Sequence, residues 1–119
     1  SKWWYPSWPD IDIENKDSYP IGIIYSPELE NWRNKTQTKT DIDVIFTIEV
    51  NTTSSSELDD LSSQVVNAIE TSTDVYRRLN LNFLVLDGTD TDSLMRDRIK
   101  MHKKTLDFSA TFTFNKSYA

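Results

Sequence analysis

The sequence predicts an α+β fold: a single, mostly antiparallel β-sheet of about four strands, with one main α-helix packed on one face. Three stretches carry this prediction. Residues 42–50 and 106–114 alternate apolar and polar side chains, the period of two expected of a strand with one buried face. Between them, residues 54–70 change to the helical period. We expect residues 1–20 to form an extended arm and residues 21–119 a single α+β domain.

The arm is rich in proline and tryptophan. Three prolines oppose helix formation there and favour extended backbone. Trp3, Trp4 and Trp8 all stand within its first eight residues, and an exposed arm does not normally carry so much apolar surface. Three interpretations stay open: the arm packs over its own domain, it lies on a neighbouring subunit, or it offers a platform on which carbohydrate rings stack.

A short strand and a long loop are expected next. Residues 21–25 follow Pro20 and are rich in isoleucine, which predicts an edge strand. Residues 26–40 show little periodicity, which predicts a loop that becomes ordered in an assembly. We expect Trp32 to be tucked under this loop. It joins the three tryptophans of the arm as a candidate subunit-interface residue.

The central strand and helix are the most clearly specified elements. The apolar face of the strand consists of Ile42, Val44, Phe46, Ile48 and Val50. Ser54 and Glu57 have the spacing of a capping box, in which the serine hydroxyl accepts a hydrogen bond from the glutamate amide. One apolar stripe then follows at helical spacing: Leu58, Leu61, Val65 and Ile69, with Ala68 beside them.

Residues 71–93 predict a short turn, a strand and a loop. A second cap-like signal at residues 71–74 predicts a turn that continues to Leu79. Residues 81–86 are apolar almost throughout, which predicts a strand buried on both faces or in the middle of the sheet. Asp87 and Gly88 form a turn signal, and polar residues 89–93 are expected to be a loop.

Residues 94–104 are basic and favour a strand over a helix. Five cationic residues against one aspartate give residues 96–104 a net charge of +4, so the rest of a chain of net charge −6 carries −10. This segment is either an exposed strand face or a surface for an acidic neighbour or a DNA-filled lumen. The candidate residues of this face are Arg96, Arg98, Lys100 and Lys104.

The last strand alternates without interruption. Its expected inward side chains are Leu106, Phe108, Ala110, Phe112 and Phe114.

Composition argues against several classes of function. The chain has no cysteine, which excludes disulfides and thiolate metal sites. Its negative charge argues against a dedicated nucleic-acid-binding protein. Gly22 and Gly88 are too far apart for a phosphate-binding loop. No apolar stretch is long enough to span a bilayer, and no signal-peptide-like run is present.

The sequence also offers no catalytic constellation. His102 is the only histidine, and no serine stands in a nucleophile-elbow context. Residues 87–92 have the acidic spacing of a calcium loop, but Arg98 occupies the position of the bidentate glutamate. We therefore expect no enzymatic activity, no catalytic residue, no cofactor and no metal.

The order of the elements resembles that of a known virion protein family. A strand begins after Pro20, and a loop with Trp32 follows it. Strand 44–50, a Ser54-capped helix and an apolar strand come next, and the chain closes on strand 106–112. This order resembles that of the tail-terminator and tail-completion proteins of the head–tail connector, or neck, in tailed bacteriophages and related archaeal viruses. The resemblance extends over roughly residues 19–114 and lies in pattern and order.

The resemblance implies a non-enzymatic structural subunit. Proteins of this family have a sheet flanked by helices and form six-fold rings, which stop growth of the tail tube, dock to the neck and leave a channel for DNA. The implied location is the head–tail junction of the virion, after assembly in the host cytoplasm. The implied partners are further copies of the chain, the tail tube protein and neck or adaptor proteins. Viral DNA passes without sequence recognition, and no membrane is involved.

Two features depart from the family pattern. The aromatic arm stands where the family commonly has a helix, and the basic segment has no fixed counterpart. Such a ring joins two different patches of neighbouring subunits, and the +4 segment and acidic remainder offer two such patches. The alternative function is a monomeric adaptor, or a carbohydrate- or peptide-binding module, that uses the tryptophan-rich arm.

Overall fold

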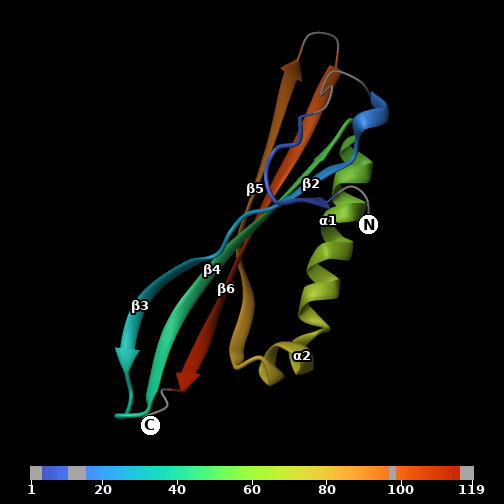
Figure 1. Ribbon diagram of the computed structural model, residues 1–119. Helices are drawn as coiled ribbons and strands as arrows, with labels where there is room; N and C mark the ends of the chain where they lie inside the picture. The colour runs from blue at the N-terminus through green and yellow to red at the C-terminus, as the bar shows by residue number, and fades with distance from the viewer. Residues whose placement is uncertain (1–3, 11–15, 97–98, 116–119) are drawn as a thin grey trace.

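The computed structural model describes residues 4–10, 16–96 and 99–115, which form an open six-stranded sheet with one main helix (Figure 1). The fold is α+β, and the sheet is larger than the four strands expected. Its strand order is β1-β2-β4-β6-β5, with β3 paired to β4. Among the described residues, β1 pairs with β2 in parallel and all other pairings are antiparallel. The elements are β1 (Trp4–Tyr5), η1 (Lys16–Ser18), β2 (Ile21–Ile24), β3 (Glu28–Asn34), β4 (Lys39–Thr52), α1 (Ser55–Glu70), α2 (Thr73–Arg78), β5 (Leu81–Arg96) and β6 (Ile99–Asn115).

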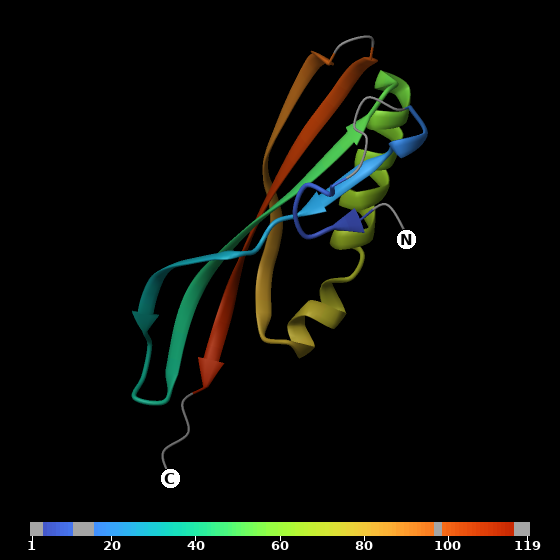
Figure 2. The ribbon, with the colours of Figure 1, turned by 45° about the horizontal axis from the view of Figure 1, so that its top comes forward.

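Strands β4 and β6 form the centre of the sheet. They pair along their whole lengths, from Lys39 opposite Asn115 to Thr52 opposite His102. The molecule is accordingly elongated, with extents of 59 × 26 × 23 Å, and the sheet twists along its length (Figure 2). Both strands were predicted from their alternation of apolar and polar residues. Each strand extends beyond its expected ends.

The core lies between this sheet and α1. It consists of Ile48, Val50, Leu58, Leu106 and Phe108. The Phe108 ring, with no exposed surface, stacks on Phe46 at a centroid distance of 5.2 Å. This burial confirms the predicted inward faces of the two central strands. Phe114 is the exception, since it lies at the end of β6 and is 46% exposed.

Helix α1 has the bounds that its sequence predicts, and Ser54 caps it. The Ser54 hydroxyl accepts a hydrogen bond from the Glu57 amide at 3.4 Å. The stripe of Leu58, Leu61, Val65 and Ile69 packs on the core as expected. Ala68, however, is exposed. Its expected place is taken by Ser62 and Val66, which lie one residue beyond Leu61 and Val65 and widen the buried stripe.

The loop predicted for residues 26–40 is wrong. Residues 28–34 form β3, an edge strand whose seven residues are all exposed. A register shift between Glu30 and Arg33, with Asn31 at a φ of 55°, interrupts the alternation that would have marked a strand. Trp32 is 61% exposed, so it is not tucked under a loop.

Strand β5 also differs from the prediction. The expected buried strand, turn at Asp87 and Gly88, and polar loop together form one continuous edge strand of 16 residues. Two register shifts, between Asn82 and Val85 and between Leu86 and Gly88, accommodate the turn-like residues. Because β5 is at the edge of the sheet and α1 lies over one face only, Phe83 is 83% exposed.

The basic segment divides between two strands. Residues 94–96 end β5 and residues 99–104 begin β6, so the single strand predicted over residues 94–104 is wrong. Residues 97 and 98 lie outside the described residues. The strand interpretation placed Met95, Ile99 and Met101 on the apolar side of this segment. Ile99 and Met101 are buried, but Met95 is 66% exposed.

The predicted first strand is confirmed as β2, but it is not at the edge of the sheet, because β1 pairs with its other side. The predicted turn near residue 75 is the short helix α2. Ile21 and Ile23 of β2 are fully buried. They lie on the face opposite α1, where the Tyr19 hydroxyl donates a hydrogen bond to the Met101 sulfur at 3.4 Å. Among the described residues, no helix has the length and apolar character needed to cross a membrane.

Candidate interaction surfaces

The three candidate tryptophans among the described residues occupy different environments. Trp4 belongs to β1, is half-buried and packs against the core under α1. Trp8 is 40% exposed and Trp32 is 61% exposed, the latter on edge strand β3. Trp3 lies outside the described residues. The structure therefore places Trp4 within its own domain.

A buried polar cluster ties β2 and the residues around Trp8 to the sheet. Tyr25, just after β2, hydrogen-bonds to Glu49 and Trp8, and burial together with the Glu49 carboxylate raises the pKa of the tyrosine. The Glu49 side chain is 8% exposed and also approaches Lys103 at 3.8 Å. Asn51 donates to Glu49 at 3.1 Å and to the Ile21 carbonyl at 3.2 Å. These partners stabilise a carboxylate that would otherwise be costly to bury.

Of the four candidate residues of the basic face, the structure describes the side chains of Lys100 and Lys104, and these two lie in different environments. Lys100 is exposed near the start of β6. Lys104 is half-buried and lines a cleft of about 270 Å³ between α1 and β5, together with Glu70 and Ser62. Arg98 and the side chain of Arg96 lie outside the described residues.

His102 lies on β6, where it pairs with Ser93 of β5. Its Nδ1 lies 3.1 Å from the Ser93 hydroxyl, across the β5–β6 pair. Its neighbours along β6 are Met101 and Lys103, of which the lysine approaches Glu49. No group of three or more His, Asp or Glu side chains in the described part of the chain is placed to hold a metal ion.

The sheet face opposite α1 carries an acidic groove that the sequence did not predict. Its volume is about 350 Å³. The groove is lined by Glu30, Asp43, Ile45, Phe83, Asp87, Ser109, Ala110 and Thr111. It therefore draws residues from β3, β4, β5 and β6. No sequence pattern pointed to it, because β3 was predicted to be a loop and Asp87 was predicted to belong to a turn.

Two aspartates at one end of this face are held by ion pairs. Arg33 makes two hydrogen bonds to the Asp43 carboxylate, at 2.9 and 3.1 Å, which with Asn31 lower the pKa of Asp43. Lys35, at 3.1 Å, and the Thr113 hydroxyl, at 2.9 Å, likewise lower the pKa of Asp41. The charges of Asp41 and Asp43 are thus balanced by partners within the chain.

Both long sides of the sheet end in edge strands. Strand β5 forms one side, and β1 with β3 forms the other. Large exposed apolar side chains stand on these edges, including Leu29 and Trp32 on β3 and Phe83 and Val85 on β5. Edge strands with unpaired backbone groups and exposed apolar side chains are typical sites of association.

Comparison with known proteins found no protein-family model that matches this chain and no curated protein similar to it in sequence.

Proposed function

We propose that this chain is a structural virion protein of a tailed virus. It forms a ring, with six subunits, that terminates the tail tube and joins it to the head or neck, and that leaves a channel for DNA. Its role is non-enzymatic, and its partners are its own copies, the tail tube protein and the adjoining neck proteins. The resemblance in order of elements supports this proposal, since helix α1 and the central strands have the expected positions.

The main structural support is the pair of open edges. A ring needs two different surfaces on each subunit, because each copy contacts one neighbour on either side. Strand β5 and the β1/β3 side lie at opposite edges of one sheet, and both expose apolar side chains. A monomeric protein normally protects such edges. Strand addition between neighbouring copies would cover both.

The alternative, a monomeric adaptor or glycan-binding module built on the tryptophan arm, has less support. Stacking of sugars needs exposed aromatic rings close together. Trp4 instead packs against the core of its own domain, and Trp8 is bonded to Tyr25.

The decisive experiment is the solution mass of the purified chain by light scattering, with negative-stain images of the same fraction. Six-fold rings with a central hole are the expected result. If the chain is a monomer, tail tube protein is added, and the expected result is conversion to rings on the tube. A monomer that stays a monomer with tube protein present would contradict the proposal.

A further inference from the structure

The cleft between α1 and β5 combines apolar walls with polar side chains. Its volume is about 270 Å³. Leu106 of β6, which is 1% exposed, lies at its base. Val66 of α1 and Leu86 of β5 line it from two sides, and both are half-buried. These three side chains give a ligand in the cleft an apolar surface to cover.

Lys104 brings a positive charge to this cleft. Its side chain is half-buried, and it takes part in no ion pair among the described residues. The neighbouring Lys103, in contrast, approaches Glu49 at 3.8 Å. A half-buried ammonium group has lost part of its hydration, and an anion beside it would replace the lost interactions.

Ser62 gives an independent sign that a partner is missing. This residue of α1 also lines the cleft and is 2% exposed. Its hydroxyl oxygen has no hydrogen-bond partner among the described residues. A buried hydroxyl without a partner is costly, and native proteins leave few of them. A ligand that carries an oxygen acceptor into the cleft would give this hydroxyl a partner.

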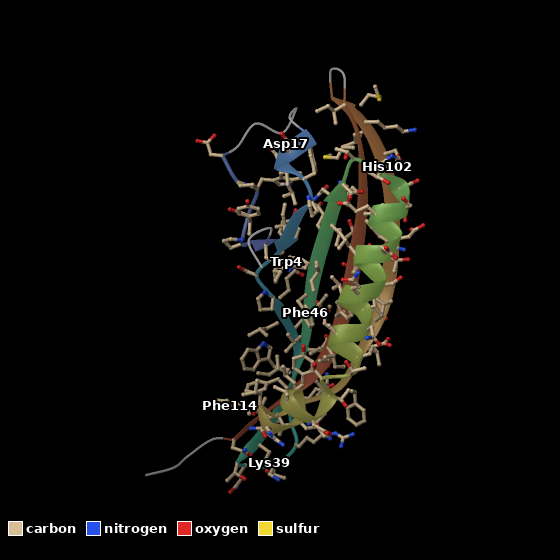
Figure 3. The ribbon with its side chains drawn as sticks, turned by 90° about the vertical axis from the view of Figure 1, so that its right-hand side faces the viewer. Trp4, Asp17, Lys39, Phe46, His102 and Phe114 are labelled. Atoms are coloured by element: carbon tan, nitrogen blue, oxygen red, sulfur yellow. The ribbon has the colours of Figure 1, made fainter. Side chains whose placement is uncertain are left out.

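The strand register places Lys104 near the start of α1. The helix begins three residues after Thr52, which is paired with His102, so it starts beside the beginning of β6 and runs in the direction of β6. Figure 3 shows His102 at the same end of the molecule as the start of α1. Lys104 lies about 7 Å beyond His102 along β6, and Ser62 lies about 10 Å beyond Ser55 along the helix. A lysine side chain is long enough to bridge this difference in level.

Glu70 is at the other end of the cleft. It is the last residue of α1, eight positions and about 12 Å beyond Ser62, and its side chain is exposed. The cleft is therefore cationic at the end near Lys104 and anionic at the end near Glu70.

This arrangement specifies a class of ligand. One cation and apolar walls suit a carboxylate with an apolar body, whereas a phosphate dianion needs more donors or cations. Glu70 disfavours a second negative charge at the far end. Since a cavity of about 150 Å³ holds benzene, this cleft has room for about ten non-hydrogen atoms. An eight-carbon monocarboxylate has this size.

We propose that the cleft between α1 and β5 binds a medium-chain monocarboxylate. The carboxylate lies at the Lys104 end, where the ammonium group and the Ser62 hydroxyl donate hydrogen bonds to it. The alkyl chain covers Leu106 between Val66 and Leu86 and extends toward Glu70. This site goes beyond the proposed function, and the two are tested by different measurements, so either can fail alone.

An NMR titration of the purified, ¹⁵N-labelled chain with octanoate tests the proposal. Binding at low ionic strength is expected, with the largest shifts at the amides of Ser63, Asn67 and Thr89, which line the cleft. Octanamide, which has the same size without the charge, should bind at least about tenfold more weakly. Absence of binding at millimolar octanoate, or shifts confined to residues outside the cleft, would overturn the proposal.

Substitution of Lys104 tests the carboxylate end. Lys104→Gln should weaken octanoate binding by about tenfold or more, because it removes the charge. Lys104→Arg keeps the charge and should retain most of the binding. Lys100→Gln is the matched control, since Lys100 is an exposed lysine on the same strand, and it should bind like wild type. Wild-type affinity in Lys104→Gln would overturn the proposal.

Substitution of Ser62 separates a binding role from a structural one. Ser62→Ala should weaken octanoate binding severalfold without lowering the midpoint of urea denaturation, because the lost hydroxyl has no partner in the unliganded protein. Ser63→Ala, at the neighbouring exposed position, is the control for helix propensity. Lower stability with unchanged octanoate binding would contradict the binding role of Ser62.

A dicarboxylate tests the orientation of the ligand. Octanedioate should bind wild type more weakly than octanoate does, because its second carboxylate lies near Glu70. Glu70→Gln should reduce this difference, whereas Asp60→Asn, which removes an exposed acid elsewhere on α1, should leave it unchanged. Equal affinity of wild type for the two acids would contradict the orientation. Circular dichroism of every variant establishes that the fold is retained, and the wild-type titrations stand without any variant.

Discussion

Among single residues, Phe83 has a backbone conformation and an exposure that are unusual for its bulky apolar side chain. Its positive φ would suit glycine, and its ring is almost fully exposed. A monomer gains nothing evident from this residue.

Phe83→Gly should therefore leave the monomer as stable as wild type or raise its free energy of unfolding by about 1 kcal/mol, because the strain is relieved. Urea denaturation measures this change. Val85→Gly is the control: it is also exposed on β5 but has an ordinary φ, so it should lower stability by about 1 kcal/mol. A large loss of stability in Phe83→Gly would show that the ring supports the fold.

The ion-paired aspartates make stability depend on acid pH. Asp41 and Asp43 have pKa values lowered below the ordinary range, chiefly by Lys35 and Arg33. Their stabilisation is complete above the unfolded pKa near 4 and is lost as the pH falls through the lower folded values. The midpoint of urea denaturation should therefore fall to lower urea concentration as the pH is lowered below about 4.

Asp43→Asn tests this assignment. The variant should be less stable than wild type at neutral pH, and its stability should fall less steeply in acid. An acid profile identical to that of wild type would show that other carboxylates control the transition.

At the scale of elements, helix α1 begins where its capping residue places it. The Ser54 hydroxyl accepts from the Glu57 amide at 3.4 Å and lies 2.9 Å from the Ser56 hydroxyl. Ser54→Ala should cost about 1 kcal/mol of unfolding free energy. Ser55→Ala, one residue later and exposed, is the matched control and should have a much smaller effect. Equal effects of the two substitutions would contradict the capping role.

Two tryptophans of the N-terminal arm, Trp4 and Trp8, differ in burial. Trp4 packs against the core beside β2, whereas Trp8 is 40% exposed. Trp4→Ala should lower the free energy of unfolding by about 2 kcal/mol, less than a fully buried aromatic because the ring is half-buried. Trp8→Ala should cost less. If Trp4→Ala were neutral in the monomer, the arm would be held by something other than its own core.

At the scale of the whole molecule, stability should be highest along the central pair of strands. Strands β4 and β6 each have neighbours on both sides, whereas β3 and β5 pair on one side only. Hydrogen exchange should therefore be slowest near Phe46 and Phe108 and fast in β3 around Trp32. Assembly should slow the amides of the edge strands most, and equal protection of all six strands in the monomer would contradict this ranking.

Local patterns in the sequence are enough to predict three of the elements. The alternation in residues 42–50 and 106–114 and the Ser54 cap each depend on neighbours a few positions away, so β4, α1 and β6 could be predicted. The apolar run of residues 81–86 predicted a strand correctly but not its exposure, since burial depends on which other elements cover it.

The edge strands, the register and the groove depend on pairing between residues far apart in the chain. Strand β3 has no apolar face of its own and exists through its pairing with β4, aided by the Arg33–Asp43 ion pair. Strand β5 continues through Gly88 because β6 supplies hydrogen-bond partners along its length. Glu30 and Asp87 are 57 positions apart in the chain. They meet at one groove because four strands lie side by side, which no local pattern encodes.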